Sequence, residues 1–177
     1  MMSHNRRTAI LQLLSSRQQP TTGTELAQHF GVSRQVIVQD IALLRAQGAA
    51  IIATPRGYLY EIPSTEDKFV QRLACQHTAQ QTRLELTTMI EAGCRVKDVI
   101  VEHPLYGEIR GLLLLNNIAD VDDFIARYEN QPAQLLSSLT EGIHLHTLEA
   151  DYPGAIKEAK RRLDQLGLLL PSHRGNK

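Results

Sequence analysis

The chain has 177 residues and no net formal charge, with 42% hydrophobic and 21% charged residues. This length suits two small domains, and the composition is that of a soluble protein with packed cores. No stretch approaches the ~20 uncharged apolar residues that a membrane helix needs, and the N-terminus has no apolar signal core. We therefore expect a cytoplasmic protein without a membrane partner.

The charges are unevenly distributed although they sum to zero. Residues 1–62 carry six basic and three acidic side chains, and the rest of the chain carries the compensating acidic excess. A basic first part fits a domain that meets a polyanion.

The chain contains two cysteines, Cys75 and Cys94. Two are too few for a disulfide framework at this length, and they do not form a CxxC pair. We expect two reduced thiols in or near a core, and not zinc ligands.

The first part of the chain predicts short helices. Apolar residues at helical spacing favour a helix over about 6–16. Thr22 and Glu25 have the spacing of a capping box, in which each side chain satisfies a backbone amide of the first turn, and they predict the start of a second helix. Gly31 ends that helix, since glycine enters the left-handed conformation without strain.

The turn Phe30–Ser33 joins this helix to a third one, which Ser33 caps. Two helices joined by a tight turn containing glycine define a helix-turn-helix, whose second helix enters the major groove of DNA. Two β-prone runs, at 51–53 and 58–60, predict a hairpin that would act as a wing. The side chains expected to contact DNA are Ser33, Arg34, Gln35, Gln39 and, at the hairpin tip, Arg56.

The segment LAQHFGVSRQVIVQDIALLRAQG lies within this part. Over residues 6–60 the chain resembles the winged-helix domain of bacterial regulators and of biotin repressors. We expect residues 1–62 to form a winged helix-turn-helix DNA-binding domain. Ile62–Thr65 is the expected linker.

Beyond the linker, strand-like and helical segments alternate. The predicted segments are strands at 69–75, 95–102, 108–115 and 143–148, and helices at 79–92, 121–130 (with Asp120 as its cap) and 154–166. The order β-α-β-β-α-β-α predicts a small layered α/β sandwich domain over residues 66–170, with its helices on one sheet face, in an α+β protein. The tail from Pro171 onward is expected to fray.

Histidines in this second domain have the spacing of a metal site. His144 and His146 are two apart on a predicted strand and so point to the same sheet face. If the first and last strands pair, His77 comes close to them, and the following helix presents Glu85. Three imidazoles and a carboxylate suit zinc, nickel, iron(II) or manganese, and this ligand set does not choose between them.

The motifs CQH (75–77), VEHPLYGEI (101–109) and GIHLHTLE (142–149) resemble the three-histidine domain of bacterial regulators. That domain occurs fused to this type of winged helix, in a family that includes niacin-responsive repressors of NAD-synthesis and niacin-transport genes. The resemblance implies one divalent metal per chain, held by His77, Glu85, His144 and His146. It also implies a homodimer, which matches a helix-turn-helix on a two-fold operator of double-stranded DNA.

The segment HPLYG is, by itself, a turn between strands whose Pro and Gly set the backbone angles. With the resemblance, His103 and Tyr106 become candidates for binding an effector, expected to be nicotinic acid. A pyridine carboxylate needs a cation or metal for its carboxylate and an aromatic or imidazole partner for its ring.

Two other functions stay open at this point. In the first, the metal ion itself is the signal for a metal-sensing regulator. In the second, the chain is a metal-dependent enzyme fused to a DNA-binding domain, or a ligase like the biotin ligases. The second domain lacks a Gly-rich nucleotide loop and a separate general base, so we expect no enzymatic activity.

Overall fold

The computed structural model describes residues 3–61, 68–131 and 133–170, and the side chains from Asn5 onward within them. The chain divides into two compact units, Met1–Thr65 and Glu66–Lys177, which are treated separately below. The expected linker and the expected frayed tail both lie outside the described residues. Among the described residues, no helix is long and apolar enough to cross a membrane.

The first unit contains the predicted helices and hairpin. Its elements are α1 (Ser3–Ser16), α2 (Gly23–Phe30), α3 (Arg34–Ala46), β1 (Ile51–Thr54) and β2 (Gly57–Tyr60). The strands pair as an antiparallel hairpin. The first helix begins three residues earlier than its apolar spacing suggested, within the ±2–4 residues by which such boundaries usually shift.

The helix ends in this unit form as predicted. Thr22 and Glu25 make both hydrogen bonds of the capping box at the start of α2. Gly31 adopts the left-handed conformation after α2, with φ of 64°. Ser33 accepts a hydrogen bond from the amide of Val36 and so caps α3. These local bonds fix the turn between α2 and α3 and hence the direction of α3.

The second unit is a four-stranded antiparallel sheet with three helices. Its elements are β3 (Phe69–Gln76), η1 (Ala79–Gln81), α4 (Thr82–Glu91), β4 (Arg95–His103), β5 (Gly107–Leu115), α5 (Ile118–Asn130), η2 (Leu136–Thr140), β6 (Ile143–Ala150) and α6 (Pro153–Gln165), where η marks a 3₁₀ segment. The predicted order of strands and α-helices is confirmed. The sheet order is β3-β6-β4-β5, so the first and last strands of the unit are neighbours.

Two details differ from the expectation. Helix α5 begins at Ile118, and its cap is Asn117, whose side chain accepts from the amide of Asp120. Asp120 instead lies in the first turn, and its carboxylate accepts a hydrogen bond from the amide of Asn116. Each of the two side chains therefore satisfies a backbone amide near the start of the helix. The 3₁₀ segment η2 had no counterpart in the prediction.

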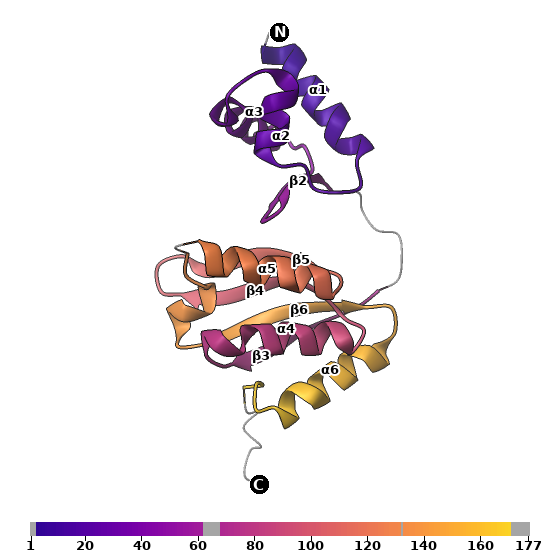
Figure 1. Ribbon diagram of the computed structural model, residues 1–177, viewed down its shortest axis with the longest axis vertical. Helices are drawn as coiled ribbons and strands as arrows, with labels where there is room; N and C mark the ends of the chain where they lie inside the picture. The colour runs from indigo at the N-terminus through magenta and orange to yellow at the C-terminus, as the bar shows by residue number, and fades with distance from the viewer. Residues whose placement is uncertain (1–2, 62–67, 132, 171–177) are drawn as a thin grey trace. The chain divides into compact units, whose positions relative to one another are not determined.

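The three helices lie together on one face of the sheet (Figure 1). The core between them and the sheet contains Leu86 and Met89 of α4, Leu148 of β6 and Leu163 of α6. This layer is where α4 faces the inward side chains of β6. The site described next is built at the end of this layer.

Candidate metal centre and DNA-reading helix

Strand pairing brings the three histidines of the predicted site together. Strands β3 and β6 are antiparallel, with Cys75 opposite His144 and Leu73 opposite His146. His77 follows the last residue of β3 directly. The ring centroids of His77 and His144 are 4.9 Å apart, and those of His144 and His146 are 4.8 Å apart. The predicted pairing of the first and last strands therefore occurs, and it gathers all three rings.

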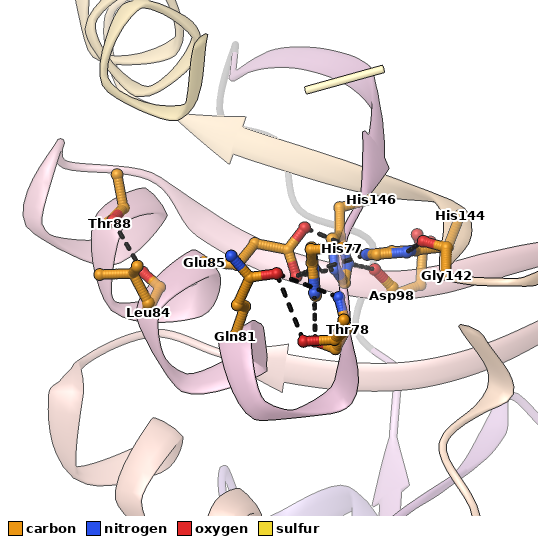
Figure 2. A network of polar contacts seen from close by, with 10 residues as sticks. All are labelled: His77, Thr78, Gln81, Leu84, Glu85, Thr88, Asp98, Gly142, His144 and His146. Atoms are coloured by element: carbon orange, nitrogen blue, oxygen red, sulfur yellow. Dashed lines mark hydrogen bonds and ion pairs between the residues drawn. The ribbon is translucent and has the colours of Figure 1, made fainter. Parts of the chain in front are cut away.

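Glu85 joins these rings from helix α4. Its side chain is completely buried. One carboxylate oxygen lies 2.7 Å from Nε2 of His77 and 3.3 Å from Nε2 of His146, and the other lies 3.1 Å from Nε2 of His144. Figure 2 shows the carboxylate and the three rings pointing toward one another. All four predicted ligand side chains thus converge on one point.

The other nitrogen of each ring is held by the main chain. Nδ1 of His77 lies 2.8 Å from the carbonyl oxygen of Thr78, and Nδ1 of His144 lies 2.8 Å from that of Gly142. Nδ1 of His146 lies 2.6 Å from the carbonyl oxygen of Asp98. A carbonyl oxygen only accepts, so each Nδ1 carries a hydrogen and donates it. In a neutral ring, Nε2 then holds a lone pair.

The arrangement needs positive charge at its centre. Three Nε2 lone pairs and a carboxylate are all acceptors, and acceptors do not face one another at 3 Å without a proton or a cation between them. Three buried imidazolium ions around one carboxylate would leave net positive charge in the core, which is costly. One divalent cation satisfies all four groups at once. The donor set therefore fits a transition metal, with each imidazole oriented by a main-chain carbonyl.

The pKa shifts in the cluster show that the histidine rings favour a positive charge next to the Glu85 carboxylate, which protons supply in the metal-free protein and a metal ion could supply instead. Burial alone disfavours the imidazolium, but the Glu85 carboxylate outweighs it and raises the pKa of His77 and His146. Burial likewise disfavours the ionised carboxylate of Glu85, but the attraction of His146 and the hydrogen bonds from the rings hold its pKa well below the ordinary value. Nε2 of His77 is buried and has no well-aligned hydrogen-bond partner among the described residues.

A β-bulge next to His146 shapes the site. The register of β4 shifts between Val96 and Asp98. Past the shift, the Asp98 carbonyl oxygen meets the His146 ring, while its fully buried carboxylate accepts from the Thr147 amide and pairs with Arg110 of β5. One residue therefore ties three strands together at the metal-site end of the sheet.

Gly142 supports two of the histidines. Its carbonyl oxygen accepts hydrogen bonds from Nδ1 of His144 and from the backbone amide of His77, the latter at 3.4 Å. Its φ is +85°, and an added Cβ would overlap the carbonyl oxygen of His77. Only glycine fits this close approach.

Cys75 was not expected at the site, but the structure places it there. A ligand atom from each of Cys75, Glu85 and His144 lies within 4.8 Å of the other two, and all three side chains are buried. This Cys/Glu/His group is compatible with a metal site. Burial, followed by the charge and hydrogen bond of Glu85, raises the pKa of the Cys75 thiol, so it stays protonated. The CxH spacing of Cys75 and His77 was an available signal, since residues two apart at the end of a strand share a face.

His103 and Tyr106 lie elsewhere in the second unit. His103 is the last residue of β4 and Tyr106 lies in the turn before β5, and their rings stack with centroids 5.0 Å apart. Tyr106 is 72% exposed. Neither residue lines the cavity beside the histidine cluster, so the structure does not bring them together with the four ligands.

The residues expected to contact DNA gather at the start of α3 and in the hairpin turn. Arg34, Gln35 and Gln39 are exposed on α3, and Ser33 caps it. Arg56 lies in the turn between β1 and β2 and is half-buried. An exposed helix start after a tight turn is the geometry by which such helices reach base edges.

Both units match known protein domains. Residues 6–59 match a family model described as an HTH domain, and residues 70–172 match one described as the 3H domain. The chain is 40% identical to "Transcription repressor NadR" of Bacillus subtilis (strain 168), over 96% of each chain. It is 38% identical to "Probable transcription repressor NiaR" of Thermotoga maritima, over 92% of this chain and 91% of the relative. The chain therefore belongs to the family of transcription repressors that carry a helix-turn-helix domain followed by a 3H domain.

Proposed function

We propose that the chain is a niacin-responsive repressor of NAD-synthesis or niacin-uptake genes, with a metal-dependent sensor in its second unit. One observation carries the metal part. Three Nε2 atoms surround the Glu85 carboxylate while every Nδ1 donates to a main-chain carbonyl. His77, Glu85, His144 and His146 would hold one nickel, zinc, iron or manganese ion. When bound, the ion supplies positive charge and a coordination position for an anionic ligand.

The metal part is tested by elemental analysis of the purified full-length protein. We expect close to one divalent ion per chain, and almost none in Glu85→Gln, which keeps the shape of the side chain but loses its charge. The control is Glu91→Gln, an exposed glutamate at the end of the same helix. Equal metal content in all three proteins would remove this part of the proposal.

The DNA part assigns recognition to the helix-turn-helix. Ser33, Arg34, Gln35 and Gln39 would meet the major groove, and Arg56 would meet phosphate or the minor groove. A homodimer would place two such helices on a two-fold operator of double-stranded DNA. The names of the two relatives, both repressors, support a regulatory role for this site rather than a catalytic one.

The effector part assigns nicotinic acid as the signal. A ligand shifts a conformational equilibrium only by its different affinity for the two states, so nicotinate would act by favouring one placement of the two recognition helices in the dimer. DNA binding would strengthen if that placement matches the spacing of the operator half-sites. Fluorescence anisotropy of metal-loaded protein with an operator duplex, with and without saturating nicotinate, tests this. Unchanged operator affinity would remove nicotinate as the effector. His103 and Tyr106 remain proposed contacts for such a ligand.

A second function is favoured by one observation. The cavity that all four candidate ligands line has a volume of about 30 Å³, which admits an ion and water but not an aromatic ring without movement. In that case the metal itself would be the signal. Removing the ion with a chelator and adding it back distinguishes the two, because a metal sensor changes its DNA affinity without any organic ligand.

A further inference from the structure

Main-chain hydrogen bonds tie the hairpin of the first unit to the start of helix α2. Thr21 forms an isolated antiparallel bridge with Tyr58 of β2. The amide of Thr21 donates to the carbonyl oxygen of Tyr58 at 2.9 Å, and the amide of Tyr58 donates to that of Thr21 at 2.8 Å. These two bonds place Tyr58 beside the residues that open α2, the cap Thr22 and the first helical residue Gly23.

Gly57 makes this approach especially close. Its φ is +128°, and an added Cβ would stand 2.5 Å from the carbonyl oxygen of Thr21. Only glycine fits both the backbone angle and the short distance. The hydroxyl of Thr21 is buried and accepts a hydrogen bond from Nη1 of Arg17 at 3.2 Å. The base of the hairpin and the start of α2 are therefore held in a fixed position relative to each other.

The side chain of Arg34, in the first turn of α3, lies across Gly23 and beside the ring of Tyr58. Its Cγ and Nε lie 3.6 and 3.5 Å from the point where a Cβ would stand on Gly23. Cε2 of Tyr58 lies 3.5 Å from the same point. The stem of Arg34 thus runs over the backbone of α2 and close to the edge of an aromatic ring, although the residue as a whole is exposed.

The guanidinium group of Arg34 keeps its donors available. Within the part of the chain that the structure describes, Arg34 takes part in no hydrogen bond or ion pair. Arg6 differs, because its Nε lies 2.6 Å from the carboxylate of Asp40 and is used inside the unit. Contacts of the stem, and not a protein acceptor, therefore restrict Arg34, and its N–H groups remain free for a base edge or a phosphate.

We propose that Gly23 and Tyr58 are positioning residues for Arg34, which hold its side chain in the conformation that meets the operator. This role rests on the proposed function, which assigns Arg34 to DNA. A long side chain loses conformational freedom when it binds, and a stem that is already held loses less. The hairpin then acts on recognition through α3, in addition to any contact that Arg56 makes with DNA.

Tyr58 is tested by fluorescence anisotropy of the metal-loaded, full-length protein with saturating nicotinate and an operator duplex selected from random sequences. We expect Tyr58→Leu, which removes the flat ring, to bind about two- to ten-fold more weakly, the range for freeing one long side chain. Tyr58→Phe keeps the ring and should stay close to the parent. The control is Tyr60→Leu, which removes another half-buried tyrosine of the same strand that packs against the same core.

A double-mutant cycle separates positioning from stability. If Tyr58 acts through Arg34, Tyr58→Leu weakens DNA binding in the parent and leaves it unchanged in Arg34→Ala. If Tyr58 only stabilises the hairpin, the same loss appears in both backgrounds, and the positioning role is overturned. A loss in Tyr58→Phe as large as in Tyr58→Leu also overturns it, because the hydroxyl and not the ring would then be needed.

Gly23 gives a second test that leaves the hairpin unchanged. Gly23→Ala should bind DNA like the parent, since its methyl group reaches only ordinary contact distance from Arg34 and Tyr58. Gly23→Leu fills the place of the arginine stem, so its affinity should fall toward that of Arg34→Ala, and it should have no further effect in the Arg34→Ala background. Alanine and leucine have similar helix propensities, so the two variants differ mainly in side-chain length. Equal affinities in Gly23→Ala and Gly23→Leu would contradict the proposed place of Arg34.

The Arg34→Ala variant separates a failure of the positioning role from a failure of the proposed function. If Arg34→Ala binds the operator as tightly as the parent, the assignment of Arg34 to DNA fails, and the positioning role fails with it. If Arg34→Ala binds more weakly while Tyr58→Leu and Gly23→Leu bind like the parent, only the positioning role is overturned.

Discussion

Nδ1 of His146 lies 2.6 Å from the main-chain carbonyl oxygen of Asp98, on the neighbouring strand. This contact exists because β4 shifts register just before Asp98. The bulge turns the carbonyl toward the ring and leaves the carboxylate free to hold the Thr147 amide. The ring is thereby fixed in the tautomer whose Nε2 faces Glu85, which is how metal-binding imidazoles are usually oriented.

Substitution of Asp98 should therefore weaken metal binding without removing a ligand. In Asp98→Asn, the amide group faces Arg110 where a carboxylate had paired with it, so the bulge loosens. We expect the affinity for zinc or nickel to fall about ten-fold, at the lower end of the effects that such outer groups have. A competition titration against a chromophoric chelator measures this.

The control for this prediction is Asp122→Asn. Asp122 is exposed and pairs with Arg83 on the surface, so its charge is lost without disturbing the sheet. A drop of the same size in both variants would show that net charge, and not the position of His146, sets the affinity.

Much of this site could be predicted from local rules. Alternation along a strand places His144 and His146 on one face, and pairing of the terminal strands brings His77 to them. The burial of Glu85 could not be predicted in the same way. It stands between Leu84 and Leu86, of which Leu84 is exposed and Leu86 buried, and helical periodicity alone does not decide the side on which the residue between them faces.

The features that sequence reasoning missed depend on tertiary context. The bulge at Asp98, the position of Leu136 and Ser137 of η2 beside the histidine cluster and the place of Cys75 all arise from how strands and connections meet. Capping of α5 by Asn117 rather than Asp120 is a smaller example, because both residues favour a cap and the geometry of the preceding strand decides between them.

Metal binding should strengthen as pH rises toward the raised pKa values of His77 and His146, and it should level off above them. In the metal-free protein the pKa of His77 and His146 is raised above the ordinary 6.5, so these rings hold protons that the metal must displace. Protonated rings stabilise the metal-free fold fully below pH 6.5, and this contribution fades as pH passes their raised pKa values. Ionised Glu85 stabilises it above pH 4.5, and this is lost only as pH falls through its lowered pKa.

The pH dependence is measured by zinc titration between about pH 5.5 and 8.5. We expect an increase of up to about tenfold per pH unit for each proton displaced, and proton release that calorimetry in buffers of different ionisation enthalpy detects. A metal affinity that does not vary across this interval would show that the rings are already deprotonated.

Gly142→Ala should disrupt the site. The left-handed backbone alone costs an alanine about 1–2 kcal/mol, and the new methyl group would also overlap the carbonyl oxygen of His77. We expect a loss of unfolding free energy above that range, together with loss of metal binding. The matched control is Gly107→Ala, which has φ of +72° but nothing near its Cβ position. If both variants lose equal stability and keep their metal, the close approach to His77 does not matter.

Cys75 should act as a neutral donor to Glu85 and not as a metal ligand. Burial and Glu85 raise the pKa of its thiol in the metal-free protein, so a metal would have to displace that proton before the sulfur could become a ligand. The cobalt(II) form should then lack the near-ultraviolet band of sulfur-to-cobalt charge transfer, and its spectrum should be unchanged in Cys75→Ser. A strong band that disappears in Cys75→Ser, but persists when the other buried cysteine is replaced in Cys94→Ser, would make the thiol a ligand.

Arg34 should carry more of the operator affinity than any cation further along α3. It is exposed in the first turn of the helix, where recognition helices meet base edges, whereas Arg45 lies in the last turn. With an operator duplex selected from random sequences, Arg34→Ala should lose about 1–3 kcal/mol of binding free energy in fluorescence anisotropy. Arg45→Ala is the control and should change affinity little.

Because a phosphate contact and a base contact differ in their response to salt, the titration is repeated at several salt concentrations. If Arg34 contacts a phosphate, the slope of log affinity against log salt concentration falls by about one in Arg34→Ala, and binding weakens equally for all sequences. If Arg34 contacts a base, the variant instead loses its preference at one base pair. Equal losses in the two variants would mean that α3 does not enter the groove by its N-terminal turn.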